Sequence, residues 1–150
     1  MFRLLKICLL LLMIVPMFIG CQTVDEEQYE GSGMIALHNK EFQDFKNKAD
    51  GAKREVRQME QVDRVRAVAI DNDIYVGLAV SGFDRFFLKD IRKSAQDQVK
   101  KKYKKENVHV STDRKIEMEL EDIERELHTK NMSKDQLRKK LDKVEEDMKG

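Results

Sequence analysis

The stretch from Val65 to Val80 constrains the fold of this chain more than any other part of the sequence. Two runs rich in β-branched residues flank the polar triplet 71–73, Asp-Asn-Asp. Asn and Asp tolerate left-handed backbone and hydrogen-bond to their own main chain, so the triplet is typical of a tight turn. In the second run, apolar residues alternate with Tyr75, Gly77 and Ala79, which is the period of a strand with one buried face. The stretch therefore predicts a β-hairpin. The thin face that bears Tyr75 and Gly77 is either covered by other elements or open to a partner.

Apolar residues spaced three and four apart predict two amphipathic helices around this hairpin. The first runs from His38 to Met59. Its small Ala49 and Ala52 favour close packing on the sheet, whereas a coiled-coil dimer would use the same stripe. Gly51 allows a bend or a break within it. The second helix runs from about residue 84 to residue 102, and its stripe comprises Phe87, Leu88, Ile91, Ala95, Val99 and Tyr103.

A short strand is predicted at residues 107–113, with Val108 and Val110 on one face. His109 lies on the opposite face, where a surface role is the simpler interpretation than that of a catalytic base. A helix between this strand and the hairpin makes a crossover, which is right-handed if the two strands that it joins are parallel.

Two further helices are predicted at the C-terminal end. Their stripes have spacings of four, three and four residues and comprise Ile116, Leu120, Ile123 and Leu127, then Leu137, Leu141, Val144 and Met148. Ser133 and Gln136 have the spacing of a capping box, which marks the start of the second of these helices. The pair predicts a helical hairpin, whose stripes suit either docking on the sheet or binding a partner helix.

The N-terminal residues 1–20 are typical of a secretory signal, with basic Arg3 and Lys6 before the apolar run 7–19. The run is short for a membrane span, which needs about 20 apolar residues. Residues 18–21, Phe-Ile-Gly-Cys, resemble a bacterial lipobox, although Phe18 replaces the usual Leu. The resemblance implies cleavage before Cys21 and lipidation of its sulfur, with palmitate-type acyl chains. A plain signal peptide or an uncleaved anchor is the alternative.

Composition narrows the classes of function. The 29 basic and 28 acidic residues nearly balance, which gives no overall field to attract nucleic acid. Both cysteines, Cys8 and Cys21, are N-terminal, so neither a disulfide framework nor a cysteine metal site is expected. The sequence has no Gly-rich phosphate loop, no His-Glu-x-x-His and no Gly-x-Ser-x-Gly. We therefore expect a non-enzymatic protein with no cofactor, no metal, no catalytic residues and no small-molecule substrate.

One basic cluster follows the second predicted helix, and it comprises Lys100, Lys101, Lys102, Tyr103, Lys104 and Lys105. Cations at a helix C-terminus complement the helix dipole, which is one interpretation. The other is a contact for lipid headgroups or a partner.

Several segments together resemble the sporulation lipoprotein family of endospore-forming Firmicutes, of the YhcN/YlaJ type. They are the lipobox around Cys21 and residues 61–70, 73–78, 89–92 and 108–113. The resemblance implies a protein that is attached to a membrane of the forespore and spore and that has a role in germination or spore properties. The order helix, two strands, helix, strand also resembles the BON-type domain of bacterial envelope proteins, a likeness of fold alone.

These observations predict an α+β fold. A small antiparallel or mixed sheet, BON-like in its element order, has helices on one face and is followed by two C-terminal helices. The expected divisions are a lipoprotein signal peptide at 1–20, a flexible tether at 21–33, an α+β domain at 34–113 and a helical hairpin at 114–150.

The function that we expect is that of a sporulation or germination lipoprotein that acts by binding. It would be anchored by lipid on the extracytoplasmic face of the cell membrane, in the forespore or spore inner membrane. The C-terminal helices are the expected surface for any protein partner. The alternative is a general envelope adaptor in vegetative cells, which binds membrane or a protein partner.

Overall fold

The computed structural model describes residues 29–129 and 132–150 and divides the chain into two units, 1–36 and 37–150. The described part of the first unit is the beginning of helix α2 (Tyr29–Val56). This helix starts within the segment 21–33, which the sequence predicts to be a tether. Cys21 and the predicted signal peptide lie outside the described residues, and the division at residues 20 and 33 stays a prediction.

The second unit is built on a three-stranded sheet in the order β1-β2-β3, with strands Arg64–Ile70, Asp73–Ala79 and Asn107–Ser111. The first two strands are antiparallel and are joined at Asp71, whose φ of 50° is the left-handed conformation that Asp tolerates. The last two are parallel and are connected through the 3₁₀ helix η3 (Gly82–Phe87) and helix α3 (Leu88–Lys102). The predicted hairpin and mixed sheet are confirmed.

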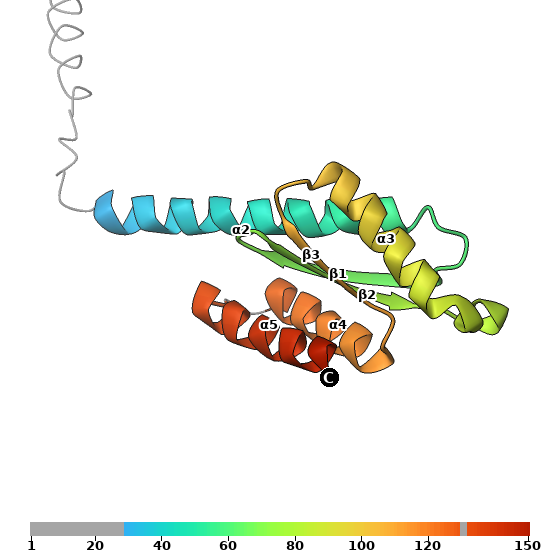
Figure 1. Cartoon of the computed structure of the whole chain (residues 1–150). Coiled ribbons are helices and arrows are strands. Elements are labelled where there is room, and N and C mark those ends of the chain that lie inside the picture. Colours follow the sequence, from blue (N-terminus) through green and yellow to red (C-terminus); the bar gives the residue numbers. More distant parts are fainter. Residues whose placement is uncertain (1–28, 130–131) are drawn as a thin grey trace, which may run out of the picture. The chain divides into compact units, whose positions relative to one another are not determined.

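Helices α2 and α3 cover one face of the sheet (Figure 1). Ala49 and Ala52 pack there, so the stripe of α2 lies on the sheet and not in a coiled-coil seam. Helix α2 continues through Gly51, where a Cβ atom would lie 1.8 Å from the hydroxyl of Tyr103. Glycine therefore lets Tyr103 cross the helix, and no break occurs. The buried residues of this layer include Val56, Val65, Ala67, Ile74, Val76, Leu78, Ile91, Ala95, Val99 and Val108.

Helices α4 (Arg114–Thr129) and α5 (Lys134–Lys149) cover the other face, which settles what lies over Tyr75 and Gly77 (Figure 1). The buried residues of this second layer include Val68, Ile70, Tyr75, Ile116, Leu120, Ile123, Leu137, Leu141 and Val144. The capping box at the start of α5 is confirmed, since the Ser133 hydroxyl accepts a hydrogen bond from the Gln136 backbone N–H. The apolar stripes of both C-terminal helices are thus used within the second unit.

Further details of the helices differ from the sequence prediction. Helix α2 ends at Val56, although Met59 is still buried beyond it. The second predicted helix is replaced at its start by η3, and Phe87, expected on the buried stripe, is 58% exposed. The tighter 3₁₀ turn rotates Phe87 off the face on which Ile91 and Ala95 are buried.

Candidate functional site

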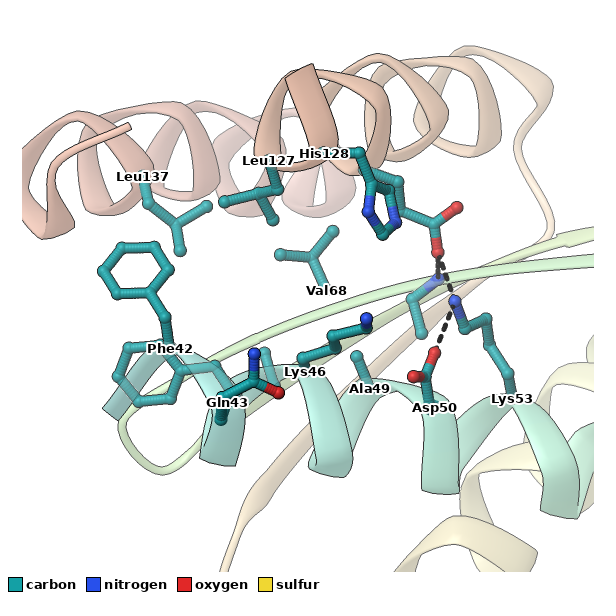
Figure 2. Close-up of a pocket in the computed structure, with 14 residues that line it drawn as sticks. Phe42, Gln43, Lys46, Ala49, Asp50, Lys53, Val68, Leu127, His128 and Leu137 are labelled. Carbon is teal, nitrogen blue, oxygen red and sulfur yellow. Dashed lines mark hydrogen bonds and ion pairs between the residues drawn. The ribbon is translucent and has the colours of Figure 1, made fainter. Parts of the chain in front are cut away.

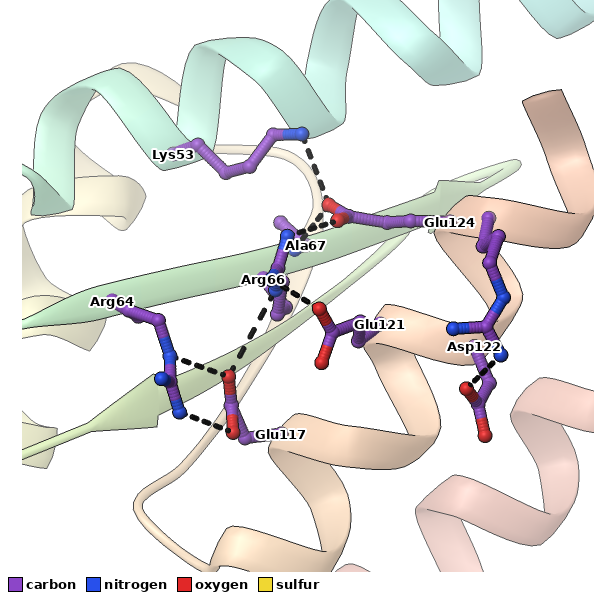
Figure 3. A network of polar contacts seen from close by, with 9 residues as sticks. Lys53, Arg64, Arg66, Ala67, Glu117, Glu121, Asp122 and Glu124 are labelled. Carbon is purple, nitrogen blue, oxygen red and sulfur yellow. Dashed lines mark hydrogen bonds and ion pairs between the residues drawn. The ribbon is translucent and has the colours of Figure 1, made fainter.

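Strand β1 lies at one edge of the sheet, and a network of charges binds it to α4 (Figure 3). Residues of a strand point alternately to opposite faces, so Arg64 and Arg66 share the face of Val68, toward α4. Both arginines contact Glu117, at 3.3 Å from Arg64 and 3.8 Å from Arg66, and Arg66 also pairs with Glu121. Carboxylates one turn apart on α4 therefore meet alternate residues of β1.

Glu117 is the most enclosed member of this network, with only 1% of its surface exposed. It lies where α4 comes closest to the sheet, because a Cβ atom on Gly77 would be 2.8 Å from the Glu117 Cα. A buried carboxylate is tolerated when cations are close to it, and the two arginines of β1 meet that need. The network therefore positions α4 on the strand.

Glu124 closes the open edge of β1. Its Oε1 atom accepts a hydrogen bond of 3.1 Å from the Ala67 backbone N–H and one of 2.9 Å from Lys53 on α2. Unpaired N–H groups on an edge strand attract further strands, and a side-chain acceptor removes that tendency. At the other edge, Gln96 donates to the Val108 carbonyl at 3.1 Å. Helix side chains thus occupy backbone groups of both edge strands.

Replacing Glu124 by Ala is expected to lower the free energy of unfolding by about 1–3 kcal/mol, because the Ala67 N–H and Lys53 lose a half-buried acceptor. Denaturant unfolding measures the change. The matched control on the same helix is Asp122→Ala, whose exposed pair with Arg125 contributes at most about 0.5 kcal/mol. Equal effects of the two substitutions would show that the edge hydrogen bond does not stabilise the fold.

A pocket of about 230 Å³ lies beside this edge, between α2, β1 and the C-terminal helices (Figure 2). Phe42, Val68, Leu127 and Leu137 form its apolar wall. Three of its charged groups pair with one another, since Lys53 contacts both Asp50 and Glu124 at 2.9 Å. Burial raises the pKa of Asp50, but the hydrogen bond from Lys53 and the nearby positive charges together outweigh burial and leave this pKa below its ordinary value. These paired charges form the polar part of the pocket lining.

The hairpin turn is held to α5 by a second group of charges. Arg138 contacts Asp71 at 2.7 Å and Asp73 at 3.1 Å. The hydrogen bond from Lys134 to Asp71 is the largest of the effects that hold the pKa of this carboxyl below its ordinary value. For Asp73, burial raises the pKa, but hydrogen bonds from Asn107 and Arg138 leave it lowered. These ion pairs thus hold α5 against the hairpin turn of the sheet.

Tyr75 lies beneath α5 and stacks on His109, with ring centroids 4.7 Å apart. Its hydroxyl donates a hydrogen bond of 3.1 Å to Glu145. Burial, together with this carboxylate, raises the pKa of Tyr75 well above its ordinary value. His109 lies on the face opposite Val108, as the sequence predicts, and its contacts with Tyr75 and Asp73 are those of a packed residue.

The predicted basic cluster is divided by the fold. Lys100 donates to the Glu106 carbonyl and Lys102 pairs with Glu55, both at 2.7 Å. Tyr103 packs across Gly51 on the first core layer, so it is a packing residue. The other three lysines are exposed: Lys101, Lys104 and Lys105. Their role as headgroup or partner contacts stays a prediction.

One exposed apolar surface, on η3, was not predicted from the sequence. Phe83, Phe86 and Phe87 are 87%, 81% and 58% exposed, and all three belong to η3. Their spacing, i, i+3 and i+4, is that of a buried helix stripe, so the sequence pattern gives no sign of their exposure.

In the part of the chain that the structure describes, no helix combines the length and apolar character that a membrane span requires. Within the same residues, no group of three or more His, Cys, Asp or Glu side chains is placed to hold a metal ion.

A family model described as "Sporulation lipoprotein YhcN/YlaJ" matches residues 22–148. No curated protein matches the chain, and no solved structure does.

Proposed function

The chain belongs to the YhcN/YlaJ family of sporulation lipoproteins, and we propose that it acts by binding while anchored through lipid on Cys21. The observation that carries this proposal is the family match over residues 22–148. A lipoprotein family implies association with a membrane in sporulating cells. The proposed location is the extracytoplasmic face of the forespore or spore inner membrane, and the proposed stage is sporulation or germination.

The sequence before the match supports the anchor. The match begins at Gln22, directly after the cysteine of the lipobox. A single acyl chain holds a protein on a membrane only marginally, whereas the two or three chains of a lipidated N-terminal cysteine hold it stably.

Replacing Cys21 by Ala is expected to prevent lipidation, because the sulfur that takes the lipid is lost. The variant should then either appear in the soluble fraction or keep its uncleaved signal peptide. Fractionation of sporulating cells with an alkaline wash measures the change. Cys8→Ala is the matched control, since Cys8 lies within the predicted signal and should leave the protein on the membrane. A processed Cys21→Ala protein that resists the wash would show that lipid on this residue is not the anchor.

Binding rather than catalysis is proposed because the polar groups of the described pocket serve the fold. Lys53 and Glu124 link α2, β1 and α4 at the cavity of about 230 Å³. A protein partner on the C-terminal helices would meet their charged outer face, since their apolar stripes are buried. The exposed residues of α5 include Lys139, Asp142, Lys143 and Glu146.

The timing of expression tests the biological role. Transcription confined to the forespore supports a sporulation or germination role, and constitutive transcription would favour a general envelope adaptor. Partner capture is best made with charge reversals on the outer face of α5, such as Lys143→Glu. Removing α5 would expose the Tyr75 layer and confound loss of binding with loss of fold.

A further inference from the structure

The three phenylalanines of η3 form a protruding apolar surface at one end of the second unit. Figure 1 shows η3, coloured yellow-green, extending beyond the strands of the sheet. None of the six residues of η3 is buried, so Phe83 and Phe86 contribute almost nothing to the core. Large aromatic side chains that are exposed together usually mark a surface that meets another apolar phase.

The residues around this surface are basic and unneutralised. Between Gly82 and Ser94 the chain has four basic and two acidic residues. Arg85, Lys89, Arg92 and Lys93 are exposed, and within residues 29–129 and 132–150 they form no ion pair. By contrast, both arginines of β1 are paired with carboxylates of α4. The cations next to the phenylalanines are therefore available to an external anion.

We propose that η3 and the start of α3 form a second membrane contact. In this contact Phe83, Phe86 and Phe87 insert into the interface of a bilayer, and Arg85 and Lys89 bind the headgroups of anionic lipids. Aromatic rings are favourable at the level of the headgroups, and each nearby Lys or Arg adds attraction to an anionic leaflet. The contact extends the proposed function, because a lipid on Cys21 would hold the domain close to the same membrane and raise the effective concentration of the surface.

Charge favours a bilayer over a second copy of the chain. Two copies that met through η3 would bring Arg85 and Lys89 of both copies together, and like charges in contact oppose association. An anionic bilayer accepts the rings and neutralises the cations at the same time. The shape agrees, because η3 is a protruding turn that can enter a soft interface.

The test uses the absence of tryptophan from the sequence. The Phe86→Trp variant of the full-length protein carries a single indole at an exposed position, so the fold is expected to be unchanged. It is mixed with vesicles of phosphatidylcholine and phosphatidylglycerol that have brominated acyl chains. We expect a blue-shifted emission that the brominated lipid quenches. The matched control is Met118→Trp on α4, half exposed, which should be neither shifted nor quenched.

A second variant tests the cations. Adding Arg85→Glu and Lys89→Glu to Phe86→Trp is expected to weaken insertion by more than about tenfold, since each cation near an anionic surface contributes about 1 kcal/mol. Flotation of the protein with the vesicles measures attachment through the Cys21 anchor, whereas quenching of the Trp emission measures insertion of η3. Protein that floats while the Phe86→Trp emission is unquenched overturns the second contact and leaves the anchor intact. A blue shift that depends on protein concentration without vesicles would also overturn it, and would assign η3 to self-association.

Discussion

Replacing Val76 by Asp is expected to leave the second unit unfolded at 25 °C. Val76 is fully buried in the central strand, beneath the layer formed by α2 and α3. An unpaired carboxylate there costs several kcal/mol, and the packing of the valine is lost as well. Small domains have only about 5–15 kcal/mol of stability, so this single change consumes most or all of it.

Far-UV circular dichroism with thermal denaturation measures this result, and the expected outcome is loss of the cooperative transition. The matched control is Ser81→Asp, which adds the same charge at an exposed position just after β2 and should change stability by no more than about 0.5 kcal/mol. An unchanged melting curve for Val76→Asp would mean that Val76 is not buried in the folded protein.

Replacing Gly77 by Ala is expected to destabilise the protein by about 1–3 kcal/mol, which is the usual effect of overpacking a core. The added Cβ would lie 2.8 Å from the Glu117 Cα and 3.2 Å from Leu120 Cδ1. The first of these neighbours is backbone, so the whole of α4 must shift to make room. Without such a clash, a Gly-to-Ala change stabilises a protein by about 0.4–1 kcal/mol through the unfolded chain, so the sign of the effect is informative.

Denaturant unfolding gives the magnitude for Gly77→Ala, and hydrogen exchange gives the location. Faster exchange should appear in α4 before it appears in α2 and α3, which lie on the opposite face. Ser94→Ala, on the exposed side of α3, is the control that should leave both measurements unchanged. A more stable Gly77→Ala protein would show that α4 does not approach the sheet this closely.

Local patterns were sufficient to predict much of the fold. The alternation around Val76 predicted the strand and which residues share each of its faces, because a period of two beside a turn-forming Asp71-Asn72 pair indicates a strand; it did not predict that both faces are buried. Ser133 and Gln136 predicted the capping box, since the contact joins residues three positions apart. Each of these features is decided within a few residues of sequence.

Features that join distant segments were not predictable in the same way. Nothing in the spacing of Glu117 or Glu124 indicates that they meet Arg64 and Ala67, because carboxylates on an amphipathic helix are usually solvated. The position of α5 over Tyr75 was likewise not predictable, because it depends on which face of the sheet the C-terminal helices pack against. Phe87 was assigned to a buried stripe because periodicity cannot tell a 3₁₀ turn from the first turn of an α-helix.

The second core layer also determines when this protein can finish folding. Its members include Leu141 and Val144, within the last ten residues of the chain, and they pack with Val68 and Tyr75 of the hairpin. Contacts between residues so far apart in sequence form late, after the local hairpin and the crossover. A chain exported from its N-terminus therefore cannot bury Tyr75 until its last helix has crossed the membrane. If the chain is exported as proposed, export and the completion of the fold are separated in time, and the exposed hairpin needs protection from aggregation during that interval.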